Sequence, residues 1–202
     1  MSTPADPTNP SGHRLTPAGG PRLRTDVVDV YIYQRSSRPP AGLVHAAPPA
    51  RSSMDSDSAG ASSPARERVY FLQLLRAGPP LANTWHPVMG HVESGETAVA
   101  CALRELREEV GLTRPLALHA LEQVHPFFIA ELDSIVLSPR FAAEVAPGWE
   151  PALDAEHTAF RWVAAGDAPS MFVWPGQLAA CREVLDWVLP AGSLMRDIIR
   201  VL

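Results

Sequence analysis

Three glutamates stand close together in the segment GHVESGETAVACALRELREEVGL, which spans residues 90–112. Glu105, Glu108 and Glu109 are three, four and one positions apart, and side chains three or four positions apart are neighbours on a helix surface. Carboxylates at this spacing repel one another, so the cluster is either a solvated acidic helix face or a divalent-cation site. The cluster offers only hard oxygen ligands, which favour Mg²⁺ or Mn²⁺ over Zn²⁺.

The residues around these glutamates also fit the binding of an anion through a metal. Arg104 can form ion pairs with the carboxylates and hold their geometry. Gly90 and Gly95 flank a loop that contains Glu93 and Glu96, and glycine lets backbone amides approach a ligand closely. The helix that follows would present its N-terminus, which favours negative charge.

The whole segment resembles the Nudix box. The resemblance covers nine specified positions without a gap: Gly90, Glu96, Arg104, Glu105, Leu106, Glu108, Glu109, Gly111 and Leu112. It implies hydrolysis of a nucleoside diphosphate linked to another group, with water attacking phosphorus. Substrate and chain are both negative, so a bound Mg²⁺, or Mn²⁺, would neutralise phosphate oxygens and acidify the attacking water.

Residue roles follow from the same resemblance. It implies that Glu105, Glu108 and Glu109 bind the metal and that Arg104 orients them. Gly90, His91 and Glu96 are expected on the substrate side, Glu96 as a structural or auxiliary acid. The carboxylate that takes the proton from water stays open among the three glutamates and a residue outside the box.

Two further segments are similar to those of bacterial dATP or dihydroneopterin-triphosphate pyrophosphohydrolases. They are WHPVMGHVE at residues 85–93 and EHTAFRWV at residues 156–163. This similarity implies a metal-binding role for Glu156, against the alternative of a surface carboxylate. The expected activity is Mg²⁺-dependent cleavage of a (deoxy)nucleoside or pterin triphosphate to a monophosphate and pyrophosphate.

Other functions stay open at this stage. The substrate could instead be another nucleoside diphosphate derivative, such as a dinucleoside polyphosphate or a nucleotide sugar. A non-catalytic Nudix domain that senses a nucleotide is the alternative of a different class, although a sensor need not keep all the glutamates. The aromatic residues that could stack on a base, or simply belong to the core, are Trp85, Phe127, Phe128 and Trp162.

Hydrophobic patterns predict the elements that position these residues. Strands are expected at residues 26–33, 68–76, 85–88, 116–128, 134–145 and 158–164. Helices are expected at residues 97–110, with Thr97 as N-cap and Gly111 as C-cap, and at residues 175–189. On a helical wheel, Val99, Leu103, Leu106 and Val110 form the stripe that docks on the sheet. The fold class is α/β, a Nudix-type α/β/α sandwich with a mixed sheet between helices.

The domain boundaries follow from loss of pattern. Residues 1–24 are expected to form a disordered tail, residues 25–190 the Nudix hydrolase domain, and residues 191–202 a C-terminal tail. Within the domain, residues 35–67 are rich in proline and serine and predict a disordered insertion.

Composition limits the partners. A chain of 202 residues with a formal charge of −5 argues against a coat for nucleic acid or a membrane-surface protein. No run of 18 apolar residues and no secretory signal is recognisable, and two cysteines make no disulfide framework. We therefore expect a cytoplasmic protein whose partner is a small-molecule nucleotide-type substrate, with no nucleic acid and no membrane. Whether it forms a homodimer stays open.

Overall fold

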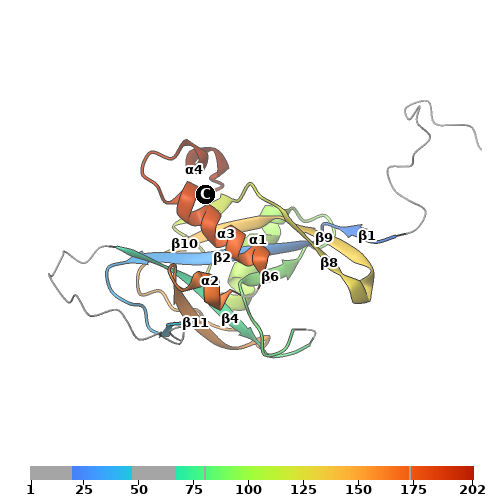
Figure 1. Cartoon of the computed structure of the whole chain (residues 1–202), viewed down its shortest axis with the longest axis horizontal. Coiled ribbons are helices and arrows are strands. Elements are labelled where there is room, and N and C mark those ends of the chain that lie inside the picture. The colour runs from blue at the N-terminus through green and yellow to red at the C-terminus, as the bar shows by residue number, and fades with distance from the viewer. Residues whose placement is uncertain (1–19, 47–66, 80, 173) are drawn as a thin grey trace, which may run out of the picture.

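A mixed eight-stranded sheet forms the centre of the molecule, and helices cover both of its faces (Figure 1). The computed structural model describes residues 20–46, 67–79, 81–172 and 174–202. The sheet order is β3-β11-β4-β2-β10-β7, with β5 paired to β4 and β6 paired to β2. The strands of this sheet are β2 (Val27–Ser36), β3 (Leu43–Val44), β4 (Arg68–Arg76), β5 (Trp85–His86), β6 (Val88–His91), β7 (Ala117–Ala120), β10 (Arg140–Val145) and β11 (His157–Ala164).

The sheet is mixed because two of its pairings are parallel. β10 runs parallel to β2 and β11 parallel to β3, whereas β2–β4, β4–β11 and β7–β10 are antiparallel. A second, three-stranded sheet has the order β1-β9-β8 and projects from one end of the molecule (Figure 1). It comprises β1 (Arg22–Arg24), β8 (His125–Ile129) and β9 (Ser134–Ser138), with the short 3₁₀ helix η1 (Ala130–Leu132) between the last two.

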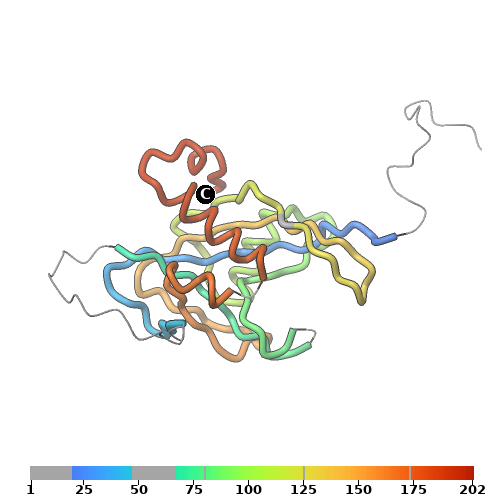
Figure 2. The backbone as a smooth tube through the Cα atoms, in the orientation of Figure 1, coloured from blue at the N-terminus to red at the C-terminus, as the bar shows by residue number. Residues whose placement is uncertain are grey.

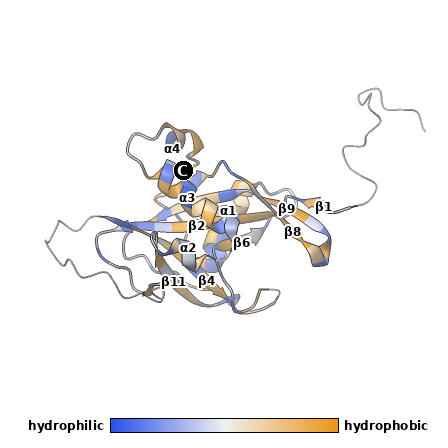
Figure 3. Ribbon diagram, viewed as in Figure 1, coloured by the Kyte–Doolittle hydropathy of each residue, from blue (hydrophilic) through white to orange (hydrophobic). Residues whose placement is uncertain are grey.

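Side chains alternate along β2 and β4 to build one hydrophobic core on each face of the large sheet. Val30, Ile32 and Leu72 pack with α1 (Ala98–Val110), while Tyr31 and Phe71 pack on the opposite face. The opposite face is covered by α2 (Ala168–Met171), α3 (Pro175–Glu183) and the π-helical turn η2 (Val184–Val188). Figure 3 shows the hydrophobic residues along these central strands. The arrangement confirms the predicted α/β class with a mixed sheet between helices.

Several predicted elements are divided in the structure. The expected strand at 116–128 is two strands, β7 and β8, because the chain turns at Glu122 and Gln123, whose amides donate to the Glu183 carboxylate. The expected strand at 134–145 divides into β9 and β10 at Pro139, which has no N–H to continue a ladder.

The predicted absence of regular structure is wrong at some residues. β1 lies inside the expected tail 1–24, and the end of β2 and all of β3 lie inside the expected insertion 35–67. Both short strands pair with distant partners, β1 with β9 and β3 with β11, which local composition does not reveal. Residues 1–19 and 47–66 lie outside the described residues.

The expected tail 191–202 contains the helix α4 (Leu194–Ile199) and then joins the large sheet (Figure 2). Ser193 caps α4 by accepting a hydrogen bond from the Arg196 amide at 3.2 Å. The Val201 amide donates to the Leu118 carbonyl at 2.7 Å, and Arg200 forms a bridge with His119. These last residues therefore lie along β7, at the end of the sheet.

Asp29, a half-buried residue on β2 whose Oδ1 atom is inaccessible to solvent, gives the fold a pH-dependent stability. Burial raises the pKa of Asp29 to about 6, although the Arg140 guanidinium and a hydrogen bond from Ser138 act in the opposite direction. Because the folded-state pKa lies above the unfolded one, the fold should lose stability as the pH rises from about 4 through 6. Between pH 4.5 and 7.5, the free energy of unfolding of the wild type should fall by about 2 kcal/mol more than that of Asp29→Asn. Urea unfolding of both proteins at the two pH values measures this difference.

The control for this prediction is Asp186→Asn, at an exposed position on η2. It should leave the pH dependence of the unfolding free energy as in the wild type. Equal pH profiles for Asp29→Asn and the wild type would contradict the assignment.

Candidate active site

Helix α1 holds the glutamates in fixed positions because both of its ends are capped. The Thr97 hydroxyl oxygen accepts a hydrogen bond from the Ala100 amide at 3.2 Å. At the other end, Gly111 adopts the left-handed conformation with φ of 68°, and its amide donates to the Arg107 carbonyl at 3.1 Å. The predicted helix and both predicted caps are thereby confirmed.

Arg104 connects four groups of the site through its guanidinium. Its Nε and Nη2 each donate to Glu96 at 3.0 Å. Its Nη1 donates to Glu105 Oε1 at 2.8 Å and to Glu108 Oε2 at 3.0 Å, and its Nη2 also donates to the His91 carbonyl at 2.8 Å. The guanidinium lowers the pKa of Glu96, whose carboxylate also accepts the Glu93 amide. Arg104 thus joins the loop before α1 to the glutamates on it.

Glu105 fills the space that Gly90 leaves empty on β6. A Cβ placed on Gly90 would lie 2.0 Å from Glu105 Oε1 and 2.1 Å from two carbons of the same side chain. No side chain at position 90 is compatible with this placement of the carboxylate. The role of Gly90 in the structure is therefore to admit Glu105.

Glu109 is the most deeply buried carboxylate of the cluster. Its side chain is 5% exposed, and its Oε2 atom has no hydrogen-bond partner among the residues that the structure describes. Burial raises its pKa to about 9, and the negative charges of Glu105, Asp154 and Glu156 add to this effect. Burial likewise raises the pKa of Glu105, against the opposing effect of Arg104. The two side chains lie in a setting that disfavours their negative charge unless a cation is supplied.

This placement differs from the helical wheel. Glu105 and Glu109 are buried together with Leu106 and Val110, and of the three glutamates only Glu108 is exposed. The wheel placed only apolar side chains against the sheet, whereas Glu105 also faces the sheet and occupies the space at Gly90 on β6.

The site fits a divalent cation by the chemistry of its donors. Carboxylate oxygens are the ligands that Mg²⁺ prefers, and Glu109 Oε2 is a buried acceptor without a partner. Glu105 Oε1 and Glu108 Oε2 accept hydrogen bonds from Arg104 in this arrangement. Within the described ranges, no three or more His, Cys, Asp or Glu side chains are grouped so that they could already hold a metal ion. Binding would therefore involve a rearrangement of these carboxylates relative to Arg104.

Glu156 lies at the exposed rim of this region. Its side chain is 60% exposed, and Oε2 lies 3.4 Å from Arg76 Nη2. Its charge nevertheless raises the pKa values of both Glu105 and Glu109. The structure thus brings Glu156 to the same electrostatic environment as the box glutamates, from the segment just before β11.

Sequence reasoning missed a buried histidine next to Glu109, His157, which pairs with the partly exposed Asp154. His157 Nδ1 lies 2.9 Å from Asp154 Oδ1, and its Nε2 lies 3.8 Å from Glu109 Oε2. The ring of His86 packs against His157 at 5.3 Å, and burial lowers the His86 pKa to about 4. The spacing Asp154-x-x-His157, directly before the predicted strand, was the available signal.

The aromatic candidates separate into three environments. Trp162 is completely buried, and Phe127 and Phe128 are exposed on β8 of the small sheet. Trp85 is partly buried, with the Arg161 guanidinium 4.2 Å from the centre of its ring. These three environments do not share one surface of stacked rings.

Two kinds of sequence comparison show which proteins this chain is similar to. The sequence model of the NUDIX domain matches residues 62–192. The asymmetrical bis(5'-nucleosyl)-tetraphosphatase of Caenorhabditis elegans is 30% identical over 103 residues, which are 50% of this chain and 72% of that protein. An octanoyltransferase of Myxococcus xanthus is 38% identical over 92 residues, 45% of this chain. The chain spans only 25% of the length of that transferase.

Solved structures show the same fold. The C. elegans Ap4A hydrolase in a binary complex has a TM-score of 0.56 at 18% identity, covering 80% of this chain and 95% of that one. The E. coli dihydroneopterin triphosphate pyrophosphohydrolase has a TM-score of 0.55 at 19% identity, covering 79% and 96%. None of the described helices is long and apolar enough to cross a membrane. With the complete box on a capped helix and the family match over most of the chain, the protein belongs to the Nudix family.

Proposed function

We propose that this chain uses Mg²⁺ to hydrolyse a (deoxy)nucleoside or pterin triphosphate to a monophosphate and pyrophosphate. The observation that carries the proposal is the buried pair Glu105 and Glu109, of which Glu105 is joined through Arg104 to the segment before α1. Buried carboxylates that repel each other are costly in a fold without a cation, and a phosphoanhydride substrate is bound through the same cation.

Each residue has a part in this proposal. Glu105, Glu108, Glu109 and Glu156 would hold the metal, which would supply charge neutralisation on the phosphate oxygens and a more acidic water. The hydrogen bonds of Arg104 hold Glu105 and Glu108 in a fixed position relative to the segment that carries His91 and Glu96. Water adds to phosphorus, the bond from phosphorus to the leaving phosphate oxygen breaks, and a carboxylate of this set accepts the proton of the water.

The alternative substrate is a dinucleoside polyphosphate. The 30% identity to the C. elegans tetraphosphatase over 72% of that protein favours it. Both candidate substrates are cleaved by attack of water on phosphorus, and they differ in the leaving group. Identification of the products therefore distinguishes the two candidates.

The test is a product analysis with Mg²⁺ across nucleoside triphosphates, dihydroneopterin triphosphate, dinucleoside tetraphosphates and nucleotide sugars. We expect pyrophosphate and a monophosphate from a triphosphate, at a rate that EDTA abolishes. Formation of a nucleoside triphosphate and a monophosphate from a dinucleoside tetraphosphate, with triphosphates left intact, would replace the first candidate by the second. The absence of turnover on every compound in the panel would contradict both.

A cytoplasmic location is part of the proposal, and fractionation of cells that produce the chain tests it. Recovery of the chain outside the cytoplasm would contradict this statement. The oligomeric state stays open, and sedimentation of the purified chain would measure it.

A further inference from the structure

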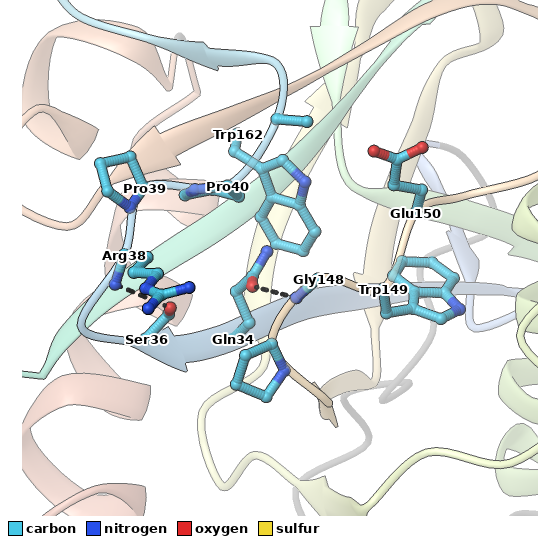
Figure 4. Close-up of a pocket in the computed structure, with 11 residues that line it drawn as sticks. Gln34, Ser36, Arg38, Pro39, Pro40, Gly148, Trp149, Glu150 and Trp162 are labelled. Carbon is cyan, nitrogen blue, oxygen red and sulfur yellow. Dashed lines mark hydrogen bonds between the residues drawn. The ribbon is translucent and has the colours of Figure 1, made fainter.

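A pocket of about 370 Å³ lies at the end of β2, apart from the box glutamates (Figure 4). The end of β2, the loop 38–41, the loop 147–150 and Trp162 on β11 line it. Its volume lies in the range of small-molecule sites, about 300–1,000 Å³.

Two buried hydrogen-bond donors on this lining have no partner. Gln34 and Trp162 are both completely buried, and neither Gln34 Nε2 nor Trp162 Nε1 makes a hydrogen bond within the described part of the chain. The orientation of the Gln34 amide follows from its other end, because Oε1 accepts the Gly148 amide at 3.4 Å (Figure 4). An unpaired buried donor costs about 1–3 kcal/mol, so two of them on one pocket indicate a ligand that supplies acceptors.

The rest of the lining describes the shape and chemistry of that ligand. Prolines of both loops and the indole of Trp149 provide flat apolar walls. Glu150 provides a carboxylate acceptor and Arg38 a cation at the same pocket. A flat ring with carbonyl or ring-nitrogen acceptors on one edge and an exocyclic amino group on another satisfies these groups, and purine bases have this pattern.

The pocket is physically connected to the active site. Trp162 belongs to the hydrophobic core on the α1 face of the sheet. The segment that carries Trp149 continues to Ala152, whose amide donates to the Val110 carbonyl, and to Asp154, whose amide donates to the Glu109 carbonyl. His157 and Trp162 are five positions apart on β11, about 17 Å along the strand. One loop therefore contributes to the pocket and to the C-terminal end of the catalytic helix.

We infer that this pocket binds a purine base of a nucleoside or nucleotide, through the Gln34 and Trp162 N–H groups and the Trp149 wall. The inference rests on the proposed function only for the choice of a nucleotide-type ring. The base can belong to the hydrolysed substrate or to a second, unhydrolysed nucleoside, and both sources share this chemistry.

The experiment measures binding of adenosine and guanosine to the full chain by calorimetry, with EDTA present and no phosphate on the ligand. We expect saturable binding of at least one nucleoside to the wild type. Gln34→Leu should weaken it at least tenfold, because the substitution removes the Nε2 donor. Since leucine also removes the Oε1 acceptor of the Gly148 amide, circular dichroism should establish that the variant keeps the wild-type fold. The matched control is Gln177→Leu, a buried glutamine on α3 whose Oε1 also lacks a partner, which should bind as the wild type does.

A second variant keeps the test decisive if Gln34→Leu does not fold. Trp149→Ala, on the partly exposed loop, should also weaken binding at least tenfold. No nucleoside binding by the wild type, or wild-type affinity in the folded variants, would overturn the inference.

Competitive inhibition of hydrolysis by the bound nucleoside would assign the pocket to the substrate, and unchanged hydrolysis would assign it to a second ligand. Binding through Gln34 without hydrolysis of any polyphosphate would contradict the proposed function alone.

Discussion

Glu109→Gln is expected to lower kcat by about a thousandfold or more, a loss of roughly 4 kcal/mol in transition-state stabilisation. The amide keeps the shape of the side chain but loses the charge that would bind the metal. Glu109 Oε2 is also a buried acceptor without a hydrogen-bond partner in the described part of the chain, so no protein group compensates for the loss. Steady-state kinetics on the substrate identified by product analysis, at saturating Mg²⁺, measure this effect.

The same substitution should have the opposite effect on metal-free stability. The folded-state pKa of Glu109 is raised to about 9, so the metal-free wild type loses stability as the pH rises from about 4.5 towards 9. Glu109→Gln should therefore melt at a higher temperature than the wild type at pH 8 in EDTA, and the difference should vanish near pH 4.5. Mg²⁺ should raise the melting temperature of the wild type more than that of the variant.

Glu131→Gln, at an exposed position on η1, is the control for the change from a carboxylate to an amide. It should leave kcat and the melting temperature unchanged. A Glu109→Gln enzyme with more than a tenth of the wild-type kcat would exclude Glu109 from the metal-binding set.

Gly90→Ala is expected to reduce kcat/KM by at least a hundredfold through the displacement of Glu105. The added methyl group would lie about 2.0 Å from Glu105 Oε1, so either the carboxylate or the backbone of β6 must move. Movement of Glu105 would also separate it from Arg104 Nη1, which now lies 2.8 Å away. Kinetics combined with circular dichroism measure the loss of activity separately from any loss of fold.

Gly166→Ala is the matched control, since its added Cβ would have no heavy atom within 4 Å. It should retain wild-type kinetics. If Gly90→Ala kept full activity, the position of Glu105 would not matter for catalysis, and the assigned role of this carboxylate would be wrong.

Local patterns were sufficient for the elements that carry the site. β4 occupies the predicted residues 68–76, and α1 begins and ends within one residue of the prediction. Alternating or continuous hydrophobic residues, an N-cap threonine and a C-cap glycine are all properties of neighbouring positions. β3 could not be predicted in this way, because its two residues become a strand only by pairing with β11.

The site itself was only partly predictable for the same reason. The resemblance to the Nudix box predicted which glutamates belong together, but a wheel of α1 could not show that Glu105 and Glu109 are buried. The burial of Glu105 depends on Gly90, fifteen positions before it. The contact of His157 with Glu109 joins β11 to α1 across 48 positions, and no local pattern encodes such a distance.

The placement of residues 200–202 along β7 has a consequence for the behaviour of the protein in solution. β7 is the terminal strand of the large sheet, and its backbone at Leu118 exchanges hydrogen bonds with Val201 and Leu202. A terminal strand with free amides and carbonyls can recruit a strand from another molecule, which is a common route to aggregation. These few residues therefore protect the chain against intermolecular strand addition, and an engineered form that lacks them would have to protect β7 in another way.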